Sequence, residues 1–363
     1  MNAIRKAKKF AIRGLKIPSS TNSQTIAKFV IEAKIPTIAK KVTCFFNIIL
    51  WSFECVVYII SNRLDFIRET FMEITKHQLG ITEGLTKSAS YMMFNIKKDS
   101  DTKFGLKILQ RFVDGRGVVA GFGNDLLKMF DMPHDENFKR AKFNNERMSD
   151  NDGYDLVLWL RNDDKGELFH QAIDINKALK DFFNFEKVVS SYTYRDKFDL
   201  SGFEDGIENP KNEEVMPASI VADGDLEGSS FWVLQQWLHD FDWLRSVSQN
   251  EKEECIGRSL DDSHQFKDLK DFAHVKRSAK ENFSPEAQIL RKSMPWSDDS
   301  LNGGFMFSGF ATSFRSFNLQ MGNMLGGSDG VVDGVFKFSK IIETSYLWCP
   351  PFKKGRLDLS LLN

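Results

Sequence analysis

The hydrophobic and polar positions after about residue 78 predict an alternation of strands and helices. Apolar or alternating runs of about four to eight residues are typical of strands, and longer runs with apolar residues three or four positions apart are typical of helices. The pattern predicts a strand, a helix, two strands, a helix and a strand, at 90–96, 104–112, 117–122, 154–160, 167–183 and 188–194. This order is that of a ferredoxin-like unit.

The same succession recurs in the second half of the chain. The pattern there predicts a strand, a helix, two strands, a helix and a strand, at 229–236, 240–255, 289–293, 305–310, 313–324 and 345–349. We therefore expect an α+β fold of two ferredoxin-like units, with helices packed on antiparallel sheets. The expected boundaries are 78–200 and 201–352, with a tail at 353–363 and a polar loop at 132–153 inside the first unit.

The first 77 residues follow another pattern and predict a helical extension. Residues 1–20 combine apolar and basic positions without acids, which favours either a mitochondrial transit peptide or a surface helix on anionic lipid or an acidic partner. The apolar run 43–61 is long enough to cross a bilayer, but Glu54 near its middle costs a few kcal/mol. The extension is therefore expected to serve in targeting, or in attachment to a membrane or a partner protein.

Composition narrows the function classes. The net charge of −1 hides an asymmetry, because residues 1–42 carry ten Lys or Arg and one acid. No nucleic-acid partner is expected, since the basic part is short and has no recognisable binding motif. The four cysteines show no C-x-x-C spacing, which argues against a structural zinc site or a disulfide framework. The 33 Phe residues point instead to large apolar cavities or interfaces.

One stretch surrounds a carboxylate with residues that shape the backbone. In the run GFEDGIENP at 202–210, glycines flank Asp205 and allow positive φ and close approach to a flat ligand, while Pro210 biases Asn209 to an extended conformation. A framed histidine, His274, and an arginine on a predicted strand, Arg291, follow downstream. An aspartate, a histidine and an arginine in this order suggest a haem peroxidase.

The run GFEDGIENP, the Ile-Gly-Arg at 256–258, His274 and the LRKSMP at 290–295 resemble the dye-decolourising peroxidase family over roughly residues 78–352. The resemblance implies haem b, with hydrogen peroxide reduced through a ferryl intermediate and an unidentified electron donor oxidised. It also implies that His274 is the axial iron ligand and that Asp333 is its carboxylate partner, although Asp329 lies only four residues away.

The resemblance implies roles for the remaining site residues as well. Asp205 would move the peroxide proton, Arg291 would stabilise developing charge, and Ser293 would hydrogen-bond the distal water. Further residues expected at the haem are Gly206, Phe307, Arg258 and Arg277, although surface salt bridges explain the two arginines equally well. Electron relay to the surface, or core packing, is expected of Trp232, Trp237, Trp243, Trp296 and Trp348.

The sequence also allows other functions, locations and assemblies. The domain could be an accessory subunit of a membrane-associated complex, attached through residues 1–77, with reduced or no turnover. A mitochondrial location, including association with the inner membrane, is expected from the leader, with a cytoplasmic one as the alternative. Self-association as a homo-oligomer is a further expectation. A weak signal at 357–362 would suit cargo of a bacterial protein shell.

Overall fold

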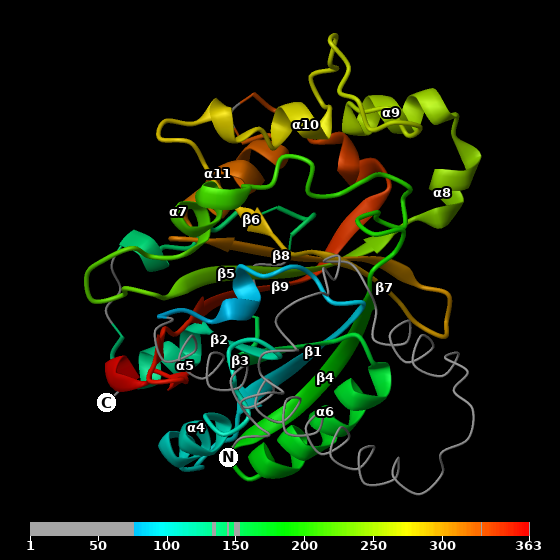
Figure 1. Cartoon of the computed structure of the whole chain (residues 1–363). Coiled ribbons are helices and arrows are strands. Elements are labelled where there is room, and N and C mark those ends of the chain that lie inside the picture. The colour runs from blue at the N-terminus through cyan, green and yellow to red at the C-terminus, as the bar shows by residue number, and fades with distance from the viewer. Residues whose placement is uncertain (1–75, 133–135, 144, 149–152, 328, 363) are drawn as a thin grey trace, which may run out of the picture. The chain divides into compact units, whose positions relative to one another are not determined.

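The strands form one continuous nine-stranded antiparallel sheet in the order β5-β9-β2-β3-β1-β4-β7-β8-β6, with an additional β5–β8 pairing. Its two halves face each other with helices on their outer sides, and they are called the first and the second sheet below (Figure 1). This computed structural model describes residues 76–363, except for 133–135, 144, 149–152, 328 and 363. The expectations for residues 1–75, including the apolar run 43–61, lie outside the described residues. Among the residues that are described, no helix is both long and apolar enough to cross a membrane.

The first sheet is built from residues 88–192. Its strands are hydrogen-bonded in the order β2-β3-β1-β4, all antiparallel, and helices α4 and α6 cover the outer face (Figure 1). The elements are β1 (Ser88–Ile96), α4 (Thr102–Leu109), β2 (Val118–Phe122), α5 (Asn124–Met129), β3 (Leu156–Asn162), α6 (Lys165–Leu179) and β4 (Phe183–Tyr192). Each predicted strand and helix of this half is confirmed, whereas α5 was not predicted.

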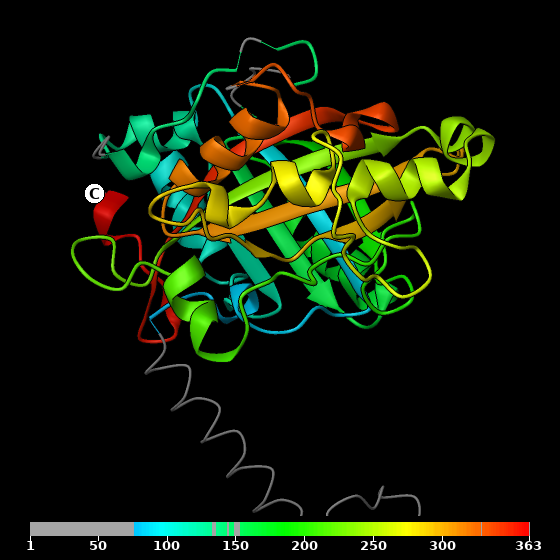
Figure 2. The same ribbon diagram turned by 90° about the horizontal axis from the view of Figure 1, so that it is seen from above.

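The second sheet is built from residues 230–349, and β5 pairs with both β8 and β9 while β6 and β7 both pair with β8. Helices α8 to α11 lie on its outer side, and Figure 2 shows the yellow to orange helices crossing above the strands. The elements are α7 (Val215–Ser219), β5 (Ser230–His239), α8 (Phe241–Ser246), α9 (Gln249–Ile256), α10 (His274–Arg277), β6 (Leu290–Arg291), β7 (Met294–Ser297), β8 (Gly303–Ala311), α11 (Arg315–Met324) and β9 (Ser339–Cys349).

Short elements complete the description. Strand β10 (Phe352–Lys353) pairs with β11 (Arg356–Leu357). The 3₁₀ turns are η1 (Leu79–Ile81), η2 (Glu136–Phe138), η3 (Asn212–Glu214), η4 (Lys280–Asn282), η5 (Gly334–Lys337) and η6 (Ser360–Leu362). Leu357 and Leu362 of the expected tail are buried against the core, so this segment is folded onto the domain.

Several predicted boundaries were wrong. Strand β4 begins at Phe183, where the helix was predicted to end, and two further differences have local reasons. The helix predicted over 240–255 is interrupted at Val247, and Ser248 begins a new helix by accepting a hydrogen bond from Glu251 N–H. Strand β9 begins at Ser339 rather than 345, because its first half alternates buried and exposed residues instead of forming an apolar run. The mixed α+β class with antiparallel sheets is confirmed.

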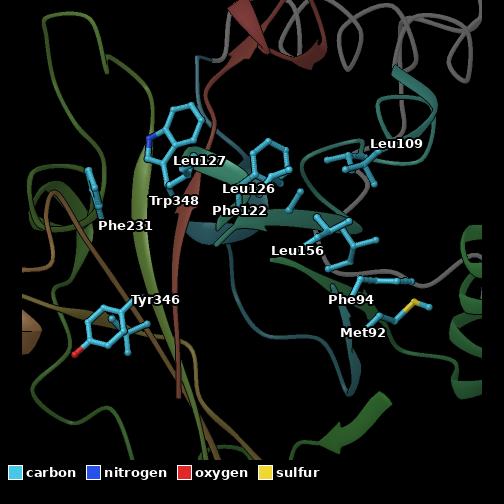
Figure 3. Packing of buried hydrophobic residues seen from close by; sticks show 14 of the residues in the cluster. Met92, Phe94, Leu109, Phe122, Leu126, Leu127, Leu156, Phe231, Tyr346 and Trp348 are labelled. Atoms are coloured by element: carbon cyan, nitrogen blue, oxygen red, sulfur yellow. The ribbon is translucent and has the colours of Figure 1, made fainter. Parts of the chain in front are cut away.

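Both faces of β1, β2, β3 and β5 are buried, which explains their nearly continuous apolar runs, whereas β4 is largely exposed. Along β1, Tyr91 and Met93 point to the core between the sheets, and Met92 and Phe94 point to the core under the helices. The helix-side core continues across the edge where Phe122 pairs with Trp348 (Figure 3). A second edge pairing joins Ser191 to Trp296. All the described residues belong to a single compact unit.

Aromatic rings fill the space between the two sheets. Trp232 lies 5.4 Å from Phe310 and 6.4 Å from both Tyr91 and Trp159, measured between ring centroids. Its indole N–H donates to the Ser308 hydroxyl at 2.7 Å. The Trp232 side chain therefore joins both sheets through packing, and its buried hydrogen bond links β5 to β8 within the second sheet.

Replacing Trp232 with alanine is expected to lower the free energy of unfolding by about 3–5 kcal/mol, because a fully buried indole is lost and a cavity remains. Denaturant unfolding measures the loss. Leu301→Ala is the control, since Leu301 is 89% exposed and its truncation should change stability by less than about 0.5 kcal/mol. Equal effects of the two substitutions would contradict the packing described here.

Candidate functional site

A mostly apolar cavity lies between the second sheet and the helices outside it. Its empty volume is about 920 Å³ including its opening to solvent, which is in the range of sites for cofactors and substrates. Strand β8 and helix α11 supply most of the apolar wall, together with Trp237 on β5 and Ile289 before β6, and most polar groups come from other segments. The apolar wall includes Trp237, Ile289, Phe305, Phe307, Phe317 and Met321. Phe307 is therefore at the cavity, as expected.

His274 reaches this cavity from the first turn of α10. Its Nδ1 lies 2.8 Å from Asp333 Oδ2, and the side chain of Asp333 is fully buried. The other carboxylate oxygen of Asp333 accepts Val335 N–H at 2.9 Å. Since Nδ1–H donates to this carboxylate, Nε2 is the ring nitrogen with a free lone pair. The contact expected between His274 and Asp333 is present.

Asp205 lines the same cavity from the loop that follows β4. Gly202 and Gly206 have φ of +97° and +77°, which is the backbone freedom that the glycines were expected to supply. Asp205 N–H donates to the Lys197 carbonyl at 2.8 Å. The loop is thereby folded so that Asp205 stands next to Arg291.

Asn209 fixes this loop to the strand that carries the arginine. Its side-chain oxygen accepts Arg291 N–H at 2.8 Å, and its side-chain nitrogen donates to the Arg291 carbonyl at 2.9 Å. From the sequence, Asn209 was expected only to adopt an extended conformation before Pro210. Its position four residues after Asp205 was the one signal for its contact with the Arg291 main chain, which lies 82 residues away.

Asp205 and Arg291 form a partly buried charge pair. Arg291 Nε lies 3.7 Å from Asp205 Oδ1 and has no hydrogen-bond partner within the described residues. Burial raises the pKa of Asp205, and the charge of Asp199 adds to this, whereas Arg291, Gly206 N–H and His274 oppose it, so that the pKa is above the ordinary value. A carboxylate with a raised pKa beside a fixed cation is suited to proton transfer.

Five expected site residues do not line this cavity: Asp333, which lies behind His274, and Ser293, Gly206, Arg258 and Arg277. Ser293 is buried and its hydroxyl accepts Ser308 N–H at 3.2 Å, while Ser293 and Gly206 line a neighbouring polar pocket that shares Asp205 and Arg291. Arg258 is bonded to Glu208, Gln265 and the Ser263 carbonyl. Arg277 is bonded to Asp329 and to Asn323 on α11. Both guanidinium groups thus form salt bridges, as the alternative had allowed, although both arginines are buried and not on the surface.

The cavity has polar residues that sequence reasoning did not assign. Asp199, Ser201, His239 and Ser339 lie on its wall, as do Ser278 and Gln320. His239 had been placed at the start of a helix, whereas it is the last residue of β5. Of the tryptophans, Trp237 alone among the five considered lines this cavity, and Trp232, Trp296 and Trp348 are buried elsewhere. Cys255 and Cys349 are buried free thiols.

Comparison with known proteins gives one family. Residues 196–354 match the family model described as Dyp-type peroxidase, C-terminal. The dye-decolorizing peroxidase of Rhodococcus erythropolis is 28% identical over 275 residues, which are 69% of this chain and 80% of that protein. Matches to two mycobacterial dye-decolorizing peroxidases span 57% and 61% of those proteins.

Solved structures share the fold at lower identity. A putative dyp-type peroxidase from Shewanella oneidensis superposes with a TM-score of 0.70 at 22% identity, covering 80% of this chain and 98% of that one. A variant of DypB from Rhodococcus jostii, solved in complex with heme, gives a TM-score of 0.66 at 21% identity and covers 76% and 96% of the two chains. The family model, the relatives and the common fold agree: residues 196–354 are similar to the C-terminal part of Dyp-type peroxidases, and the described residues share the fold of the solved dyp-type peroxidases.

Proposed function

We propose that this protein is a haem-dependent peroxidase that reduces hydrogen peroxide and oxidises an as yet unidentified electron donor. The observation that carries the proposal is that one apolar cavity is lined both by His274, backed by buried Asp333, and by the Asp205–Arg291 pair. The relatives named as dye-decolorizing peroxidases support the same reaction class.

The residues present fit haem b. Aromatic and aliphatic side chains form walls suited to a flat apolar ring, and His274 would bind the iron through Nε2. Hydrogen bonding of Nδ1–H to the Asp333 carboxylate makes the imidazole a more electron-rich ligand and fixes its orientation. Bound haem would supply the iron centre that accepts oxidising equivalents from peroxide and passes them to the donor.

The protein's own part is to move one proton and to stabilise charge. The Asp205 carboxylate would accept a proton from one peroxide oxygen and return it to the other, so that the departing oxygen leaves as water. Arg291 stays charged at all working pH values and would stabilise negative charge on the departing oxygen. The apolar walls lower the local dielectric constant, which strengthens this interaction.

The test is spectroscopic and kinetic. The purified full chain, supplied with haem, is expected to show a Soret band of a five- or six-coordinate histidine-ligated haem and to consume hydrogen peroxide in the presence of a reducing dye. A chain that binds no haem and consumes no peroxide would contradict the proposal. That result, together with stoichiometric recovery in a membrane assembly, would favour an accessory subunit instead.

Asp333→Asn is expected to weaken haem retention or turnover about 10- to 100-fold and to raise the haem reduction potential, because the amide lacks the negative charge that draws on the Nδ1 proton. Haem titration and potentiometry measure these effects. Asp329→Asn is the matched control, since Asp329 contacts Arg277 outside the cavity. A similar change in both variants would exclude a role for Asp333 as the ligand's partner.

Two finer proposals concern organisation. We infer that residues 78–200 and 201–352 are ferredoxin-like units, supported by the β-α-β-β-α-β order and the strand order in each half. We also propose a mitochondrial location, supported by the basic and apolar residues of segment 1–20. Fluorescence imaging of the full chain against a chain lacking residues 1–20 tests the location, and identical distributions would contradict it.

A further inference from the structure

A second histidine–carboxylate pair lies at the cavity, apart from His274 and Asp333. His239 Nε2 is 3.0 Å from both carboxylate oxygens of Asp199, and His239 Nδ1 is 2.8 Å from the Ser339 hydroxyl. All three residues are buried: Asp199 is 9% exposed, His239 8% and Ser339 5%. His239 and Ser339 are direct cross-strand partners on β5 and β9. The pair is therefore anchored on the rigid sheet.

Asp199 in turn organises the loop that carries Asp205. Its carboxylate accepts hydrogen bonds from the backbone N–H and the hydroxyl of Ser201. Its own N–H donates to the Phe203 carbonyl at 2.9 Å, and its carbonyl accepts Gly202 N–H at 3.0 Å. The start of the loop is thus fixed to β5 through His239, as its end is fixed to β6 through Asn209.

The pair also affects the charge that Asp205 experiences. Burial raises the pKa of Asp199, but His239 and the hydrogen bonds from His239 and Ser201 outweigh burial and hold this pKa below the ordinary value. Asp199 is therefore ionised, and its negative charge favours the protonated form of Asp205. The other charged groups that act on Asp205 are Arg291 and His274, and Glu204 lies on the same cavity wall.

We propose that His239 is a positioning residue for the proton-transfer carboxylate of this enzyme, acting through Asp199. It holds the start of the Asp205 loop on β5, and its hydrogen bond to the Asp199 carboxylate offsets part of the negative charge of Asp199, so that Asp205 remains able to accept a proton. The inference deepens the proposed peroxidase function and rests on it for the role of Asp205. The geometry of the pair itself stands without it.

The first test measures Asp205 in the full chain without haem. A carboxyl ¹³C NMR titration, with the Asp205 signal assigned by comparison with Asp205→Asn, gives its proton affinity in each variant. His239→Gln leaves Asp199 uncompensated and is expected to tighten proton binding by Asp205 on the order of tenfold. Asp199→Asn removes the like charge and is expected to weaken it, and the double variant should return close to the unmodified chain.

Opposite signs in the two single variants separate this role from general damage to the fold. His264→Gln is the matched control, because His264 also contacts an aspartate, Asp262, but both are exposed and neither lines the cavity. It should leave the Asp205 titration unchanged. If His239→Gln does not fold, Asp199→Asn alone decides, since unchanged or tighter proton binding there overturns the proposal. Shifts of the same sign in both variants overturn it as well.

The second test uses the haem-loaded protein. In His239→Gln the acid limb of kcat/KM for peroxide is expected to move to higher pH, with the Soret band unchanged. If the unmodified protein does not turn over peroxide, the proposed function fails, while the titration without haem still decides whether His239 and Asp199 set the proton affinity of Asp205.

Discussion

His274→Ala is expected to abolish normal axial ligation of the haem iron and to lower peroxide turnover by more than about 100-fold, which exceeds the 10- to 100-fold cost typical of losing a ligand's hydrogen-bond partner. The reason is that no other described histidine that lines the cavity has a free ring nitrogen, since both nitrogens of His239 are bonded. Absorption and resonance Raman spectra of the haem-supplied protein measure ligation, and stopped-flow mixing with peroxide measures turnover.

The control for this experiment is His264→Ala, which removes an exposed histidine paired with Asp262. It should leave the haem spectrum and turnover unchanged. Exogenous imidazole is expected to restore part of the spectrum of His274→Ala, because the space of the deleted ring can accept it. A His274→Ala protein that retains the original histidine-ligated spectrum would refute the assignment of the ligand.

Asp205→Asn is expected to slow the reaction with peroxide by about 100- to 10,000-fold while haem remains bound, because an amide cannot accept the peroxide proton. Single-mixing kinetics with excess peroxide measure the rate. Glu213→Gln removes an exposed carboxylate eight residues along the chain and serves as the control. Equal rates for Asp205→Asn and the unmodified protein would exclude Asp205 as the proton acceptor.

The pH dependence of the same step has a defined sign. Asp205 acts when it is ionised, so the rate should fall as pH falls through its pKa, and this midpoint should lie above that of an ordinary aspartate because burial raises the pKa. Arg291 opposes the effect of burial. Arg291→Ala should therefore move the midpoint to still higher pH, in addition to slowing the step through the loss of its charge.

Local patterns were enough to predict most of the fold. Strands buried on one or both faces have short apolar runs, and the helices α4, α6 and α11 show spaced apolar residues, so their existence did not depend on distant contacts. The helix ends at Val247 because Ser248 caps the next helix, and β9 begins early although its first residues alternate between buried and exposed. Neither the capping nor the mixed burial of β9 can be predicted from the hydrophobic pattern.

The candidate site was predicted as far as its residues lie in distinctive runs. The structure brings Asp205, His274, Arg291 and Phe307 together around the cavity, with Asp333 behind His274. These residues lie in separate runs of the sequence, so no single run predicts that they meet. Arg258 and Arg277 do not line the cavity, and the sequence cannot show that Glu208 and Asp329 already pair with their guanidinium groups. Asp199 and His239 were missed because their pairing spans two separate segments.

The amide of Asn209 bonds to the main chain of residue 291 and not to its side chain. These two hydrogen bonds do not depend on the side chain of residue 291. Exchanging Arg291 for lysine, methionine or alanine is therefore expected to leave the anchoring of the Asp205 loop intact. A series of substitutions at this one position consequently isolates the contribution of the cation from that of loop placement, a separation that mutagenesis in a tightly packed pocket rarely permits.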